Sequence, residues 1–225
     1  PEQIPAAREH FERGKDLYAQ GLYSGARAEL ERARTLGLRS ADLEYGLAQL
    51  VLMEAASKSQ TPRERAANRA GVQAATEEHL RAARAVDPEH IPSLTLLAQI
   101  CQGGFPIRNV EGLQYLERVL KLRPEMGQLR LQVALQYEIR PLEVKKLLAG
   151  TTGPRKPLGA ETQLLLSRSH LEKLIEMAPP GTVESATAQM ELAYVLTKMA
   201  DYNRAIDQAQ LAIQTFQTLG GHERD

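Results

Sequence analysis

The sequence predicts an all-α protein in which about five helix pairs stack into an α-α superhelix, or solenoid. Ala, Leu, Arg, Glu and Gln dominate the 225 residues and Trp is absent, a composition typical of helices packed through small side chains. Apolar residues recur at helical spacing between glycine and proline breaks. The breaks are periodic, because Pro88 and Pro124 are 36 residues apart, as are Ala98 and Ala134. Helix pairs of this period bury their apolar faces by stacking on their neighbours.

Helix-stopping residues bound each predicted helix of the first half. Apolar periodicity stops at Gly21 and again at Gly37, whereas Asp87-Pro88 and Arg123-Pro124 end later helices. The stretch TPRE at 61–64 supplies an N-cap, a first-turn proline and the glutamate of a capping box. The helices expected here are 7–19, 26–36, 41–56, 62–86, 92–101 and 110–122.

The second half continues the pairing, with helices expected at 128–138, 160–177, 183–199 and 202–219. Two pairs, the second and the fourth, are lengthened between their helices. The extra residues near 52–71 are expected to extend the helices. Residues 140–159 contain the Pro/Gly-rich stretch TTGPRKPLG and are expected to form a loop that projects from one face.

One helix-turn-helix pattern is written twice, as YAQGLYSGARAELERAR at 18–34 and as TKMADYNRAIDQAQLAI at 197–213. Each first helix carries a small residue near its middle. These small residues are Gly14, Gly46, Ala98, Ala134 and Ala193. Spaced alanines mark the second helices, and prolines close several pairs. The alanines and prolines are Ala26, Ala33, Ala205, Ala209, Ala212, Pro88, Pro124 and Pro179. With these features the chain resembles a tetratricopeptide repeat (TPR) protein.

The resemblance implies one domain over 1–225. Its repeats would span 7–38, 41–88, 91–124, 127–179 and 183–219. The pattern has departures: Arg13 stands where an apolar residue is usual, and Leu38 and Gln217 replace the closing proline of the first and last repeats. Terminal repeats commonly deviate because one of their faces meets solvent. The alternative is an irregular helical bundle, which the regular spacing disfavours.

The overall charge and hydropathy narrow the classes of partner. The chain has 28 Lys plus Arg against 28 Asp plus Glu, so its net charge favours neither nucleic acid nor anionic lipid. We therefore expect no nucleic-acid partner. No apolar run is long enough to span a membrane, which predicts a soluble chain. The sequence begins PEQIP without a methionine or an apolar leader, which we interpret as loss of a preceding segment. The compartment stays open, with the cytoplasm slightly favoured.

Motifs for catalysis, cofactor binding or metal binding are not found. GTTGPRK at 150–156 has two residues between its glycines and a proline after the lysine, so it does not match a phosphate-binding loop. The histidines never fall three or four residues apart, and the single cysteine, Cys101, lies on an apolar helix face. We expect no catalytic, cofactor-binding or metal-binding residues, and thus no enzyme.

A basic cluster interrupts the neutral chain in the predicted 140–159 loop. Its members are Arg140, Lys145, Lys146, Arg155 and Lys156, against Glu143 alone. The cluster could dock an acidic protein or nucleic acid. A solvated loop is the favoured interpretation, because no aromatic residues interleave to stack on bases.

In TPR proteins the first helices line a concave channel that holds a peptide or helix of a partner, and the resemblance assigns such a channel here. Its residues would be Phe11, Lys15, Tyr18, Leu43, Leu47, Leu50, Thr95, Gln99, Gln102, Leu131, Leu135, Glu138, Met190, Tyr194 and Lys198. Their apolar character suits an amphipathic helix or a Leu-rich segment. A carboxylate clamp is disfavoured because Phe11, Leu47 and Leu135 occupy positions that would need polar groups. The alternative is that packing between repeats or an added capping helix buries the apolar residues.

The function predicted is therefore a non-enzymatic scaffold or adaptor that binds a segment of a partner protein in its concave groove. A second interpretation is a regulatory or sensor segment of a larger enzyme or transcription regulator, since both ends look cut and AIQTFQTLGGHERD resembles a junction to further domains. RNA binding by a related helical-repeat array is disfavoured by the neutral charge and the apolar channel. The partner and the oligomeric state stay open.

Overall fold

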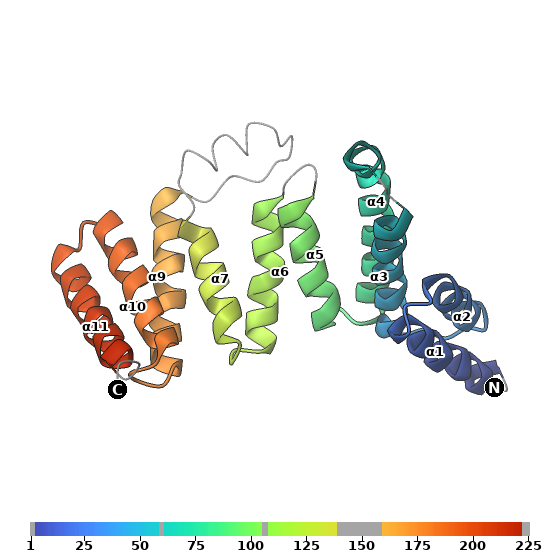
Figure 1. Ribbon diagram of the computed structural model, residues 1–225, viewed down its shortest axis with the longest axis horizontal. Coiled ribbons are helices and arrows are strands. Elements are labelled where there is room, and N and C mark those ends of the chain that lie inside the picture. Colours follow the sequence, from blue (N-terminus) through green and yellow to red (C-terminus); the bar gives the residue numbers. More distant parts are fainter. Residues whose placement is uncertain (1–2, 59–60, 105–107, 139–158, 222–225) are drawn as a thin grey trace. The chain divides into compact units, whose positions relative to one another are not determined.

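The computed structural model describes residues 3–58, 61–104, 108–138 and 159–221, and these residues form helices joined by short turns (Figure 1). No strand occurs among them. The predicted all-α fold is confirmed, and the predicted ends of the helices lie within a few residues of the observed ones. The helices are α1 (Gln3–Ala19), α2 (Tyr23–Thr35), α3 (Ala41–Lys58), α4 (Pro62–Val86), α5 (Ile91–Gly103), α6 (Asn109–Leu122), α7 (Gly127–Glu138), α9 (Ala160–Met177), α10 (Val183–Lys198) and α11 (Tyr202–Gly221).

Side-chain capping explains where two of the helices, α4 and α10, begin. Thr61 is the N-cap of α4: its hydroxyl accepts a hydrogen bond from the Glu64 amide at 3.2 Å, and the Glu64 carboxylate accepts one from the Thr61 amide at 2.9 Å. This is the capping box that the sequence predicts. Thr182 caps α10 in a simpler way, because its hydroxyl accepts from the Ser185 amide at 3.2 Å.

The described residues divide into two compact units, Pro1–Tyr115 and Leu116–Asp225, with the boundary inside α6. Each unit has a core of its own and is described separately below. The assignment of all 225 residues to one domain stays a prediction.

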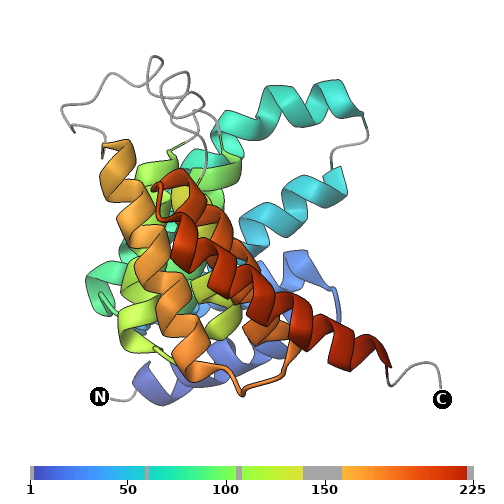
Figure 2. The same cartoon turned by 90° about the vertical axis from the view of Figure 1, so that its left-hand side faces the viewer.

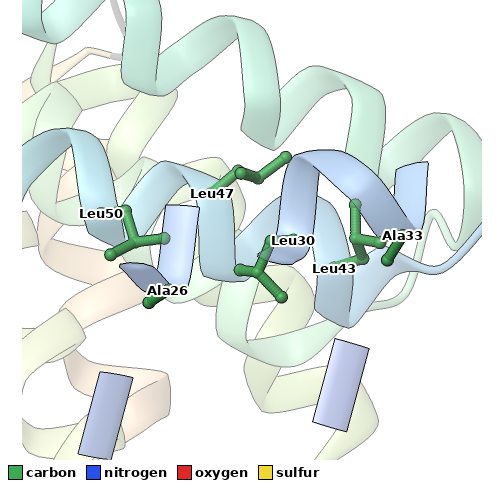
Figure 3. Packing of buried hydrophobic residues seen from close by; sticks show 6 residues of the cluster. All are labelled: Ala26, Leu30, Ala33, Leu43, Leu47 and Leu50. Atoms are coloured by element: carbon green, nitrogen blue, oxygen red, sulfur yellow. The ribbon is translucent and has the colours of Figure 1, made fainter. Parts of the chain in front are cut away.

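In the first unit, α1, α2 and α3 share a core of small and branched side chains. Figure 3 shows the side chains of α2 and α3 that meet there: Ala26, Leu30, Ala33, Leu43, Leu47 and Leu50. Helices α1 and α2 approach closely because α1 has a glycine, Gly14, where the two helices cross. A Cβ at Gly14 would lie 2.6 Å from Cδ2 of Leu30, which leaves no room for a larger residue.

A second cluster of the first unit joins the longer helices α3 and α4 to α5. Ala48, Leu80 and Leu97 are its buried members. Of the extra residues near 52–71, those that the structure describes extend both helices, so that α3 has 18 residues and α4 has 25. The second unit is built on a comparable core from α7, α9, α10 and α11. Its buried members are Ala134, Leu171, Leu192, Val195, Leu196 and Ala205.

The predicted loop at 140–159 falls almost entirely outside the described residues, as does the basic cluster of Arg140, Lys145, Lys146, Arg155 and Lys156. Of that segment the structure describes residue 159, which precedes α9.

Candidate protein-binding surface

In the second unit, the first helices of two successive pairs keep apolar side chains at the surface. Leu135 of α7 is 38% exposed, and Met190 and Tyr194 of α10 are 49% and 47% exposed. Helix α7 packs against α9 and α10, so the residues come from neighbouring elements. Leu131, one turn before Leu135, is half-buried and packs against the core cluster. We define Leu131, Leu135, Met190, Tyr194 and Lys198 as the α7/α10 surface.

Helical periodicity explains why these side chains point outward. Leu192, Val195 and Leu196 of α10 are buried in the core of the unit, and they take the inward face of the helix. Met190 and Tyr194 are four residues apart and therefore share another face. Lys198 continues this face, with its Nζ 4.1 Å from the centroid of the Tyr194 ring, where a cation interacts favourably with the aromatic π-system.

An open hollow of about 720 Å³ lies along α7, and Leu131 and Leu135 are part of its lining. Its lining combines apolar side chains with carboxamides, which can both donate and accept hydrogen bonds. The lining residues are Met126, Gln128, Leu129, Leu131, Gln132, Leu135 and Gln136. Such a mixture can hold an apolar side chain of a ligand while a carboxamide bonds to the ligand's backbone.

The last turn of α7 is held by a polar network of the second unit, in which Tyr137 and His170 are buried and Glu117 is half-buried. Glu117 Oε1 accepts a hydrogen bond from the Tyr137 hydroxyl at 2.9 Å, and it lies 2.8 Å from Nε2 of His170. Burial opposes ionisation of the Glu117 carboxyl, but the hydrogen bonds from His170 and Tyr137 outweigh it and hold the pKa of Glu117 below its ordinary value. The network holds Tyr137, which lies two residues beyond Leu135. It therefore supports the end of α7 from below the α7/α10 surface and is not part of that surface.

The first unit presents a smaller part of the predicted channel. Lys15 is exposed; its Nζ lies 5.2 Å from the Phe11 ring centroid and donates to Glu12 at 2.7 Å. Phe11 and Tyr18 are half-buried and pack against the core cluster of α2 and α3. Burial also raises the pKa of the Tyr18 hydroxyl. These aromatic rings therefore serve the core as well as the surface.

The assignment of Leu43, Leu47 and Leu50 to the channel is wrong. All three are fully buried, and they lie in the core shared with α2, whose side chains Figure 3 labels. The physical reason is the orientation of α3: these leucines recur every three or four residues on the face that packs against α2, two residues out of register with the predicted repeat. Ala48, and not Gly46, is the small residue that packs against the pair's own second helix, through Leu80.

A signal in the sequence could have corrected this register. Leu47-Ala48 matches Leu97-Ala98, Val133-Ala134 and Leu192-Ala193, and these residues are buried in every repeat where the pattern occurs. With the shift of two residues, the corresponding positions of α3 are taken by Tyr45, Gln49 and Leu52, all of them half-buried. Tyr45 and Gln49 are half-buried and bonded to one another, with Gln49 Nε2 donating to the Tyr45 hydroxyl at 3.1 Å.

The remaining predicted channel residues differ in their surroundings. Gln99 of α5 is exposed, whereas Thr95 is half-buried and donates its hydroxyl to the Ile91 carbonyl at 3.0 Å. Gln102 is half-buried as well. Glu138 ends α7, and its side chain lies outside the described residues.

The thiol of Cys101 is buried, and burial raises its pKa to about 12, so the thiolate needed for nucleophilic attack is scarce at neutral pH. Across residues 3–58, 61–104, 108–138 and 159–221, no group of three or more His, Cys, Asp or Glu side chains is placed to hold a metal ion. Within the same residues, no helix has the length and apolar character needed to cross a membrane.

A scan of protein-family models and a search of curated proteins give no match to the chain. Solved structures do match. A MamA structure is 11% identical with a TM-score of 0.59, over 97% of this chain and 96% of that one. MamA from Desulfovibrio magneticus RS-1 is 11% identical with a TM-score of 0.53, over 94% of this chain and 96% of that one.

A third match is YrrB, which is described as a TPR protein with an unusual peptide-binding site. It is 15% identical with a TM-score of 0.56, over 92% of this chain and 84% of that one. At such identities the likeness concerns the fold. The paired helices and these matches agree with the resemblance drawn from the sequence, and the chain has a TPR-like fold of stacked helix pairs.

Proposed function

We propose that this chain is a non-catalytic scaffold or adaptor that binds an apolar peptide or amphipathic helix of a partner protein on the α7/α10 surface. The fold it shares with TPR proteins supports a general role in protein interaction. The observation that carries the finer proposal is the exposure of Leu135, Met190 and Tyr194 on neighbouring first helices. Large apolar side chains gathered at the surface commonly mark interaction sites.

The spacing of these side chains suits an extended or helical ligand. Leu131 and Leu135 on α7, like Met190 and Tyr194 on α10, repeat every four residues, so each helix offers a row of apolar contacts along its axis. Lys198 adds a cation at the end of one row, where an acidic residue of the ligand could bind. Peptides that enter such grooves usually anchor through a few apolar side chains.

The proposal is tested by selecting ligands from a random peptide library displayed on phage and measuring their affinity for variants of the full chain. We expect the selected peptides to contain spaced apolar residues. Tyr194→Glu and Leu135→Glu should each weaken binding by about 1 to 3 kcal/mol, because a carboxylate loses its water against an apolar ligand.

Leu165→Glu is the matched control. Leu165 lies on α9 and is 47% exposed, as is Tyr194, but it is outside the α7/α10 surface. This variant should bind the selected peptides like the unchanged chain, and the thermal melts of all three variants should agree. A library that yields no binder, or equal losses for Leu165→Glu and Tyr194→Glu, would remove the site from this surface.

A further inference from the structure

The final helix of the second unit carries an apolar stripe that the α7/α10 surface does not include. Helix α11 packs against α10, and in Figure 2 it lies nearest the viewer, in front of that helix. Ala205 and Ala212 face the core and are buried. Beside them, Tyr202, Ile206, Ile213 and Phe216 remain between 38% and 61% exposed.

The spacing of these residues is that of the apolar positions in a coiled coil. Tyr202, Ile206, Ala209, Ile213 and Phe216 alternate steps of four and three residues, which is the heptad rhythm that keeps one side of a helix against a partner helix. We name these five residues the α11 stripe. Ala209 is half-buried at its centre, where a small side chain lets another helix come close.

The order of residues along the stripe is the same from either end. Reading inward, each end presents an aromatic residue and then an isoleucine, and Ala209 stands in the middle. Two copies of α11 that run antiparallel about Ala209 would therefore place aromatic on aromatic and isoleucine on isoleucine. A twofold contact requires this kind of self-complementarity, since the same patch serves both partners.

The edge of the stripe also fits a second copy. Asn203, Gln210 and Gln217 recur every seven residues along that edge, and their carboxamides both donate and accept hydrogen bonds. In the antiparallel arrangement Gln210 would lie near Gln210 of the second copy and Asn203 near Gln217, so carboxamides would meet carboxamides, whereas charges of one sign would repel. Among the residues of α11 after Arg204, the only charge is Asp207, which lies on a different face from the stripe. We propose that the chain forms a symmetric dimer through antiparallel pairing of the α11 stripe.

The first test is sedimentation of the full chain over a range of concentrations. The unchanged chain should pass from one copy to two as concentration rises. Ile213→Glu and Ile206→Glu should each raise the dimer dissociation constant at least tenfold, because the two-fold axis brings in two carboxylates at once. Their melting temperatures, measured where the chain is a single copy, should match that of the unchanged chain.

Leu211→Glu is the matched control, because Leu211 is 45% exposed on the opposite side of the same helix. It should leave the dissociation constant unchanged. An unchanged chain that stays a single copy up to about 1 mM overturns the proposal. The proposal is also overturned if Leu211→Glu weakens the dimer as much as Ile213→Glu does, or if Ile213→Glu leaves the dimer unchanged.

Cysteine cross-linking tests the orientation. The chain has one cysteine, which is buried, so a new thiol reports on its own position. Ala209→Cys should form a covalent dimer under mild oxidation, because antiparallel pairing places this residue opposite itself, and Leu211→Cys should not. A dimer that cross-links through Leu211→Cys and not through Ala209→Cys would contradict the pairing.

Discussion

Ala200 adopts at the α10–α11 turn the left-handed backbone conformation that Gly21 adopts at the α1–α2 turn. The φ angles are 61° at Ala200 and 76° at Gly21. The hydrogen bonds match as well: Ala200 donates to the Thr197 carbonyl and Asp201 to the Leu196 carbonyl, as Gly21 donates to Tyr18 and Leu22 to Leu17. The turn that the sequence writes twice is therefore the same structure, closed once by a glycine and once by an alanine.

We expect Ala200→Gly to stabilise the chain by about 0.5 to 1 kcal/mol. A residue with a Cβ is less stable in the left-handed region by about 1 to 2 kcal/mol, and glycine removes this strain. Part of the gain is offset because glycine loses more backbone entropy on folding. Urea unfolding measures the change. Gly21→Ala is the reverse substitution and should destabilise by a similar amount. Equal stabilities of Ala200→Gly and the unchanged chain would show that the turn is not strained.

The sequence predicts that Leu47 and Leu135 share one channel, but the structure buries the first and exposes the second. Leu47→Glu should lower the free energy of unfolding by about 3 to 5 kcal/mol, since it places an unpaired carboxylate in the core. Leu135→Glu should lower it by less than about 1 kcal/mol. Thermal melts of the two variants compare them directly, and similar losses would contradict the burial of either residue.

Gly14 and Gly71 make a second contrast. We expect Gly14→Ala to destabilise by about 1 to 3 kcal/mol, because its Cβ would lie 2.6 Å from Leu30 Cδ2 and 3.3 Å from the Ala26 carbonyl oxygen. At Gly71, inside α4, a Cβ would meet no atom within 4 Å, so Gly71→Ala should stabilise by about 1 kcal/mol. Denaturant unfolding of both variants tests the packing, and a harmless Gly14→Ala would speak against it.

The Glu117 network predicts a pH dependence. Because the folded state lowers the pKa of Glu117, the ionised carboxyl contributes stability above the ordinary glutamate pKa, and this contribution is lost as pH falls through the lowered value. Glu117→Gln should lose about 2 kcal/mol at pH 7, because a carboxamide oxygen accepts weaker hydrogen bonds from His170 and Tyr137 than a carboxylate does. Its stability should also fall less steeply below about pH 4.5. Parallel curves of stability against pH for the two proteins would contradict this role.

Much of this architecture is determined by short local sequence signals. The capping box at Thr61, the left-handed glycines and the helix-ending Pro88 act within a few residues of the backbone, so the sequence alone predicts where helices begin and end. The period of these signals also predicts the pairing and the TPR-like fold. Likewise, the heptad spacing of the α11 stripe can be read without a structure, although its exposure cannot.

The tertiary structure decided which apolar faces are covered. Helix α3 packs against both α2 and α4, so it buries Leu47 toward one neighbour and Ala48 toward the other, whereas α7 leaves Leu135 at the surface. Periodicity shows that a helix has an apolar face. The local sequence pattern is the same, however, for a leucine in the core and for a leucine on a binding surface. Whether that leucine belongs to the core or to a binding surface depends on distant helices that close over it, and only the packed structure places them.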